Sequence, residues 1–87
     1  MAKKIEIYTM TVCPFCMRAK KLLRRKDMAF EEINLSRDEN RWEEVEKRSG
    51  RQTVPQIFVD GRHLGGCDDL YELEKKGELD TILGGNP

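Results

Sequence analysis

The first 35 residues place a helix-forming segment between two β-prone segments, and this order strongly limits the possible folds. Residues 4–9 and 29–35 have the residue types and the alternation of short strands. Between them, the segment up to Lys26 is predicted to be a helix with Pro14 in its first position, where a missing N–H costs no hydrogen bond. A strand–helix–strand unit makes parallel strands joined by a right-handed crossover.

Helical spacing predicts which side chains of this first helix face the core. They are expected to be Phe15, Ala19, Leu22 and Leu23.

The rest of the chain predicts a second helix, a hairpin and a closing helix. The expected elements are a helix over 39–48, a strand over 52–59, a return strand over 62–64, a helix from 67 and a short helical piece over 79–83. Trp42 and Val45 are the expected apolar contacts of the second helix, and Asp60-Gly61 is a hairpin turn signal. The expected order is β-α-β-α-β-β-α in a single domain over residues 1–87, with residues 84–87 as a frayed tail.

Charge balance and hydropathy exclude several classes of protein. The 87 residues hold 16 Lys and Arg against 16 Asp and Glu, whereas a general nucleic-acid binder carries a basic excess. No apolar run approaches the length of a membrane span, and residues 1–4 lead into a strand pattern instead of a secretory leader. Three cysteines are too few, and odd in number, for a secreted disulfide scaffold. We therefore expect a cytoplasmic protein with no nucleic-acid or membrane partner.

Positive charge gathers in residues 18–26, which hold six Lys and Arg. The favoured interpretation is a solvated helix face. The other interpretation is a surface that attracts acidic protein substrates.

Cys13 and Cys16 stand three positions apart at the predicted strand-to-helix junction. A thiolate is the attacking species in thiol–disulfide exchange, and free cysteine has a pKa of about 8.5. A helix N-terminus stabilises the anion, and Cys-x-x-Cys motifs bring the pKa into a range of roughly 3.5–7.5. We expect Cys13 to be the exposed, attacking thiol and Cys16, one turn inside the helix, to resolve the mixed disulfide.

A half zinc site is the alternative interpretation of this cysteine pair. A structural zinc needs four ligands, and the only other candidates are Cys67 and His63, which lack a recognisable ligand spacing. We therefore expect no metal.

Three motifs occur in order within the predicted frame: Cys13-Pro14-Phe15-Cys16, Thr53-Val54-Pro55 and Gly65-Gly66-Cys67-Asp68-Asp69. Together they resemble the glutaredoxin family, specifically its small bacterial dithiol members, from Ile5 to about Leu83. The resemblance implies a thioredoxin-like α/β fold with a four-stranded mixed sheet flanked by helices. It also implies glutathione-dependent reduction of protein disulfides and protein–glutathione mixed disulfides through Cys13 and Cys16.

The resemblance implies a glutathione site around Cys13, with glutathione as co-substrate and no permanently bound cofactor. The expected binding residues are Phe15, Arg51, Gln52, Thr53, Val54, Pro55, Gly66, Cys67, Asp68 and Asp69. The Val54–Pro55 bond is expected to be cis, turning the Val54 backbone toward an extended peptide. The helix start at Cys67 suits a carboxylate, and the aspartates suit an ammonium. Arg51 and Gln52 are expected to hold the glycine carboxylate, while Cys67 is expected to be a small packed residue.

Two positions depart from the family pattern. Met10 stands where members commonly have a lysine, and Phe15 stands where many have a tyrosine. We therefore expect glutathione to bind less tightly than in lysine-bearing relatives.

Two other functions use the same cysteines. One is a redoxin recycled by thioredoxin reductase, and the other is a glutathione-ligated iron–sulfur carrier, which Pro14 disfavours. The expected partners are glutathione and disulfide-containing or glutathionylated proteins, with the chain acting as a monomer.

Overall fold

The computed structural model describes residues 3–84, so the predicted tail at 84–87 lies outside the described residues except for Gly84. The strands are β1 Ile5–Thr9, β2 Glu31–Asn34, β3 Gln56–Val59 and β4 Arg62–Gly65. The helices are α1 Pro14–Arg25, the 3-10 helix η1 Glu39–Arg41, α2 Trp42–Ser49, α3 Cys67–Lys75 and α4 Leu79–Ile82. The predicted order of elements is confirmed. Within residues 3–84, no helix combines the length and the apolar character needed to cross a membrane.

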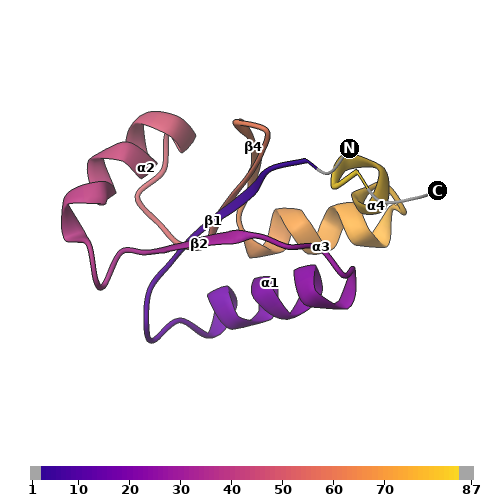
Figure 1. The fold of residues 1–87 in the computed structure, drawn as a ribbon, viewed down its shortest axis with the longest axis horizontal. Helices are drawn as coiled ribbons and strands as arrows, with labels where there is room; N and C mark the ends of the chain where they lie inside the picture. The colour runs from indigo at the N-terminus through magenta and orange to yellow at the C-terminus, as the bar shows by residue number, and fades with distance from the viewer. Residues whose placement is uncertain (1–2, 85–87) are drawn as a thin grey trace.

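The four strands form one mixed sheet in the order β2-β1-β3-β4 (Figure 1). β1 is parallel to β2, as the crossover through α1 requires, and β3 is antiparallel to both β1 and β4. α1 and α3 pack against each other on one face of the sheet, and in Figure 1 α1 lies below the sheet and α2 above it. This is the expected thioredoxin-like architecture.

Alternating side chains of the central strands build a core on each face of the sheet. Ile7 and Ile57 face α1 and α3, where they join Leu22, Leu23 and Leu70. Tyr8 and Phe58, one position along, face α2 and pack with Val45. All four residues of β3 are buried because both faces of this strand are covered.

The inward face of α1 differs from the prediction at one position. Phe15 is 54% exposed, and Cys16 takes its place in the buried row with Ala19, Leu22 and Leu23. The reason is that positions 16, 19 and 23 lie at spacings of three and four on one helix face. Phe15 lies outside that row and lines the pocket described below.

Three predicted elements are shorter or differently formed than expected. The strand at 52–59 is confined to β3, because Pro55 has no N–H to give to a sheet ladder. The helix at 39–48 begins as the 3-10 turn η1, and the Asp38 side chain makes no capping hydrogen bond. The strand at 29–35 is reduced to β2.

A partly buried polar network joins α2 to the sheet. The guanidinium of Arg48 donates to the Tyr8 hydroxyl at 2.7 Å and to Glu6 Oε1 at 3.0 Å. It also lies 4.0 Å from the centre of the Phe58 ring. The Tyr8 hydroxyl in turn donates to Glu44, so Arg48 connects two carboxylates and two aromatic rings.

We predict that Arg48→Met lowers the free energy of unfolding by about 2 kcal/mol, because it leaves Glu6 and Tyr8 without their donor. Thermal unfolding followed by circular dichroism should show a fall of roughly 10 °C. The control is Lys47→Met, because its pair with Glu43 is about three-quarters exposed at both ends. The control should change stability by less than about 0.5 kcal/mol, and equal losses in both variants would contradict the role of the network.

Candidate redox and ligand-binding site

Cys13 and Cys16 form a disulfide at the start of α1, with their Cα atoms 5.2 Å apart. Cys13 is the N-cap of the helix in an extended conformation, and Pro14 follows in the first helical position. The Cys13 sulfur accepts a hydrogen bond from the backbone N–H of Cys16, with an N···S distance of 3.2 Å. This N–H and the positive end of the helix dipole are therefore in place to stabilise a thiolate on Cys13 once the disulfide is reduced.

The exposure of the two cysteines corrects one expectation. Cys13 is 9% exposed in this oxidised form, so the prediction of an exposed thiol is wrong here. The reason is that its sulfur is bonded to Cys16, which is 1% exposed inside the first turn. Of the two, Cys13 is nonetheless the more accessible.

Side-chain hydrogen bonds support the loop at residues 53–55, which precedes β3. The Val54–Pro55 peptide bond is cis, as predicted. The Gln56 amide donates to the Thr53 carbonyl at 3.2 Å and to its hydroxyl at 3.1 Å. Gln56 is itself held by His63 of β4, with 2.6 Å between His63 Nε2 and Gln56 Oε1. A chain of hydrogen bonds thus connects β4 to the loop.

This chain of hydrogen bonds was not predicted from sequence. The available signal was Gln56, a polar residue next to the apolar run Ile57-Phe58-Val59, since a buried amide needs partners. His63, the other candidate zinc ligand, has its Nε2 in a hydrogen bond with Gln56. Burial lowers the pKa of its imidazole.

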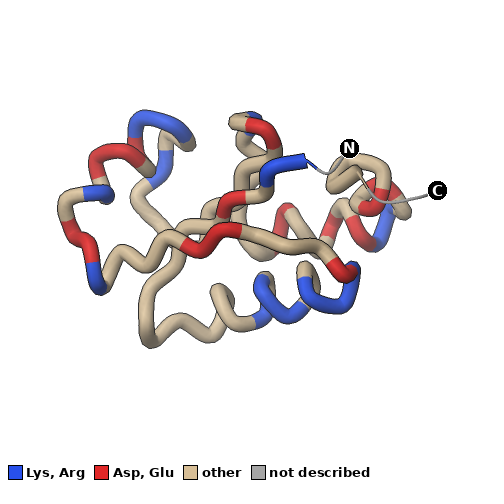
Figure 2. The backbone as a smooth tube through the Cα atoms, viewed as in Figure 1, with Lys and Arg blue, Asp and Glu red and all other residues tan. Residues whose placement is uncertain are grey.

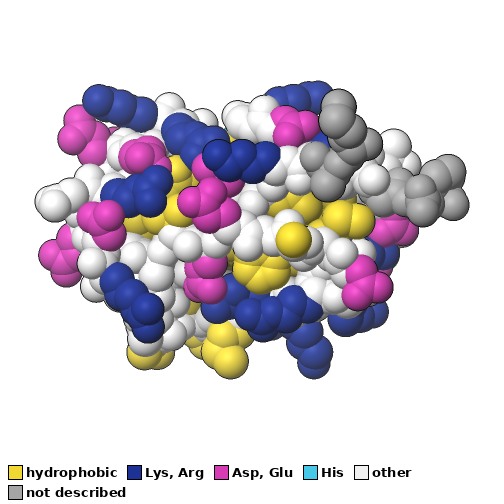
Figure 3. All heavy atoms as spheres, in the orientation of Figure 1, with side chains coloured by type: hydrophobic (Ala, Val, Ile, Leu, Met, Phe, Trp, Pro, Cys, Tyr) yellow, Lys and Arg dark blue, Asp and Glu magenta, His cyan; other side chains and the backbone are white. Residues whose placement is uncertain are grey.

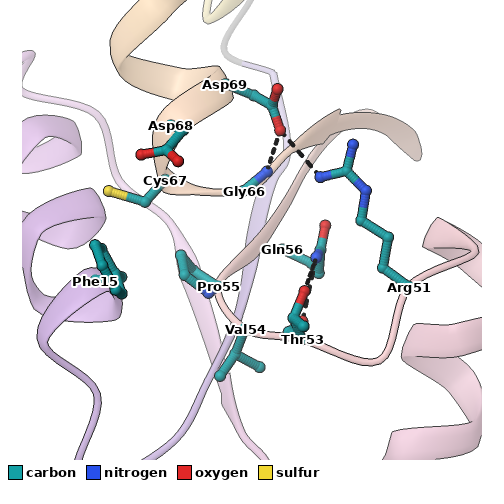
Figure 4. A pocket seen from close by; sticks show the side chains of 10 residues that line it. All are labelled: Phe15, Arg51, Thr53, Val54, Pro55, Gln56, Gly66, Cys67, Asp68 and Asp69. Atoms are coloured by element: carbon teal, nitrogen blue, oxygen red, sulfur yellow. Dashed lines mark hydrogen bonds and ion pairs between the residues drawn. The ribbon is translucent and has the colours of Figure 1, made fainter.

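The start of α3 is tied to the segment before the loop by Asp69. Its Oδ2 accepts from the backbone N–H of Gly66 at 2.9 Å and pairs with Arg51 Nη1 at 3.0 Å (Figure 4). These two contacts, the backbone N–H first, lower the pKa of the Asp69 carboxyl. Gly65 has a φ of +127°, and a Cβ there would collide with the Asp69 carboxylate, so a side chain cannot replace this glycine without moving the cap.

One shallow pocket brings most of the predicted binding residues together (Figure 4). Its lining consists of Phe15, Arg51, Thr53, Val54, Pro55, Gln56, Gly66, Cys67, Asp68 and Asp69. Its volume of about 210 Å³ is below the ~300–1,000 Å³ of pockets that enclose a drug-sized ligand. The pocket therefore suits an extended chain that lies along it with one side in solvent.

Two residues from the sequence analysis lie elsewhere. Gln52 lines a different depression, beside Trp42 and Glu46 of α2, so the structure does not bring it to this pocket. Met10 lies in a polar groove with Lys20 and Glu32.

Cys67 is buried, and its side chain extends toward Phe15 at the edge of the pocket (Figure 4). Burial raises the pKa of its thiol, which disfavours the reactive thiolate. This agrees with the prediction of a packed residue.

Sequence and fold both match proteins of one family. The Glutaredoxin family model matches residues 5–64. The chain belongs to the glutaredoxin family. It is 53% identical over 79 residues to Glutaredoxin 3 of Escherichia coli strain K12, covering 91% of this chain and 95% of the relative.

Two solved structures show the same fold. The solution structure of glutaredoxin from Brucella melitensis has a TM-score of 0.83 and 50% identity, covering 94% of this chain and 89% of that one. The crystal structure of a buckwheat glutaredoxin–glutathione complex has a TM-score of 0.88 and 28% identity. The match covers 94% of this chain and 77% of the buckwheat chain. Family membership and the Cys13–Cys16 pair together make this glutaredoxin a thiol–disulfide oxidoreductase with a redox-active disulfide.

We predict that Asp69→Ala lowers the free energy of unfolding by about 1 kcal/mol at pH 7, because the Gly66 N–H and the Arg51 guanidinium lose their acceptor. A carboxyl with a lowered native pKa stabilises the fold above its unfolded pKa of about 3.9, and loses that effect as the pH falls through the native value. The stability difference between wild type and variant should therefore shrink in acid, as measured by urea unfolding from pH 7 to pH 2.

The matched control is Asp68→Ala, the exposed neighbour. This substitution should lower the free energy of unfolding by about 0.5 kcal/mol or less, which is the usual stabilisation from a carboxylate near a helix N-terminus. A loss in Asp69→Ala that stays constant down to pH 2 would contradict the contribution of the charged cap.

Proposed function

We propose that this glutaredoxin uses glutathione to reduce protein–glutathione mixed disulfides and protein disulfides. The observation that supports the proposal is the extended pocket beside the disulfide, which combines peptide backbone at residues 53–55, a helix N-terminus and Arg51. These are groups that recognise an extended peptide with charged ends. The buckwheat relative, whose structure is that of a glutathione complex, supports the same ligand.

In this proposal the Val54 backbone pairs with the cysteine residue of glutathione, beside Pro55 and Phe15. The backbone N–H groups at the start of α3 receive the γ-glutamyl carboxylate, and Asp68 receives its ammonium. Arg51 is the cation available for a carboxylate, although it must share its guanidinium with Asp69. Gln52 is left out because it lies outside the pocket.

The reaction begins with the Cys13 thiolate attacking the glutathione sulfur of a protein–glutathione disulfide. The protein leaves as a thiolate, and Cys13 holds glutathione in a mixed disulfide. A second glutathione thiolate attacks this disulfide, releasing oxidised glutathione and restoring Cys13. With a protein disulfide, Cys16 instead attacks the mixed disulfide on Cys13, and two glutathiones then reduce the resulting Cys13–Cys16 bond.

We predict that Cys13→Ser abolishes both reactions because a serine hydroxyl cannot form the mixed disulfide. Cys16→Ser should keep the reduction of protein–glutathione disulfides and lose the reduction of protein disulfides. The measurement is turnover coupled to glutathione reductase, with a glutathionylated protein and a disulfide protein as substrates. Activity of the Cys13 variant, or equal loss of both activities in the Cys16 variant, would contradict the mechanism.

We predict that Met10→Lys lowers the apparent KM for glutathione by about two- to fivefold, the effect of one exposed ion pair of up to ~1 kcal/mol. The added cation should also lower the pKa of the reduced Cys13 thiol. Asn40→Lys, an exposed site on η1, adds the same charge as a control. If KM and thiol pKa in Met10→Lys match those of the control, Met10 does not weaken glutathione binding.

A further inference from the structure

The outer face of α1 carries a group of cations, most of which have no acidic partner within residues 3–84. α1 and its C-cap hold six Lys and Arg and no acid, as the blue segments of α1 in Figure 2 show. Two of these cations are paired: Lys20 with Glu32 at 2.9 Å, and Lys26 with Glu74 at 2.7 Å. The other four are exposed and form no ion pair within residues 3–84; we call them the α1 cations: Arg18, Lys21, Arg24 and Arg25.

Helix stability does not account for all of the α1 cations. The negative end of the helix dipole favours Arg24 and Arg25 in the last turn, but it does not favour Arg18 or Lys21. Lys21 lies three residues from Arg18 and four from Arg25, spacings at which like charges destabilise a helix. α2 shows the usual arrangement instead, because its Lys47 pairs with Glu43 four residues away.

Two of the α1 cations are held in position by aromatic rings. The guanidinium of Arg18 lies 5.3 Å from the centre of the Tyr71 ring, and that of Arg24 lies 5.7 Å from the Phe30 ring. Stacking fixes the direction of a side chain and leaves its charge free for a partner. The face is thus partly ordered before any partner arrives, which lowers the entropic cost of binding.

Apolar side chains connect these cations to the disulfide. Met17, next to Cys16, is 64% exposed, and Val12, next to Cys13, is 90% exposed. Pro14 and Met17 line one shallow depression together with Lys21 and Arg24. Figure 3 shows Lys and Arg side chains gathered at the lower edge, over α1, with hydrophobic atoms beside them.

We propose that this face of α1 docks disulfide-bearing protein substrates through an acidic segment next to their disulfide. Charge complementarity selects the acid, and Val12 and Met17 supply apolar contact at the reacting bond. A protein fits better than a nucleic acid because the face begins at the redox pair. The exposed apolar side chains that connect the cations to this pair, Val12 and Met17, are aliphatic and offer no ring on which a base could stack.

The positions of the cations determine how far from its disulfide a substrate must carry its acidic residues. Arg18 and Arg25 are seven residues apart, so the charged row extends about 10 Å along the helix axis. Because Arg18 and Arg25 lie five and twelve residues beyond Cys13, acidic residues about 8 to 18 Å from a substrate disulfide would meet the row while that disulfide meets Cys13. The reaction is dithiol exchange, in which the reduced pair gives two electrons and two protons to the substrate and becomes the Cys13–Cys16 disulfide.

The test uses full-length protein reduced with dithiothreitol and freed of it, with no glutathione present, so it does not depend on the proposed use of glutathione. The oxidants are three peptides with one internal disulfide each and a tail of four glutamates, four serines or four lysines. The rate of Cys13–Cys16 oxidation is followed by acid quench and thiol alkylation. We expect the acidic peptide to react about tenfold faster than the basic one at low salt, and the difference to fall below about twofold at 0.5 M salt.

The test variant is Arg18→Gln, Lys21→Gln and Arg25→Gln together, and the control variant is Arg62→Gln, Lys75→Gln and Lys76→Gln. Both remove three exposed cations, so their net charges match. The preference should disappear in the test variant and persist in the control, while the serine peptide reacts equally with all three proteins and so reports intact folding.

Several results would overturn the proposal. They are equal rates with all three peptides in the wild type, a preference that survives in the test variant, or an equal loss in both variants. Equal peptide rates together with binding of a single-stranded oligonucleotide by the wild type alone would assign the face to nucleic acid instead. If no peptide is reduced, the dithiol chemistry itself fails, which is a separate outcome from equal reduction of all three.

Discussion

The antiparallel pairing of β3 with both of its neighbours is the constraint on which the site depends. In this register Tyr8 lies opposite Gln56, and Ile57 lies opposite Gly65. The end of β1, the start of β3 and the end of β4 therefore meet at one edge of the sheet. The three segments that leave this edge are the start of α1, the loop at residues 53–55 and the start of α3. The redox pair and the pocket are built from these segments.

Polar contacts then fix the parts of this edge that the hydrophobic core does not hold. His63 and Gln56 support the loop at residues 53–55, and Asp69 joins Gly66 to Arg51. Directional bonds of this kind position backbone groups more closely than apolar packing does. The two helix starts also bring positive dipole ends to the same edge, where a thiolate and a ligand carboxylate need them.

The charges of the molecule are separated in space although their sum is zero. Around α2 and the sheet, acids and bases pair with each other, as Arg48 does with Glu6. The α1 cations form no ion pair within residues 3–84, and beside them the apolar residues Val12 and Met17 are exposed next to the redox pair. The pocket and the α1 face thus flank one disulfide from different segments, which would let a small peptide and a protein surface approach it separately.

The sequence by itself determined the order of the elements, the single crossover, the position of Cys13 at a helix start and the cis Val54–Pro55 bond expected from the family motif. These features follow from local signals: hydrophobic period, a proline at the first helical position, a hairpin turn and short motifs. Only the tertiary structure decided which side chains meet. In the structure, Phe15 lines the pocket instead of the core, and Gln52 lies outside the pocket. His63 contacts Gln56, and Arg51 pairs with Asp69. These outcomes depend on strand register and on contacts between residues at least 7 positions apart, and no local pattern in the chain encodes such contacts.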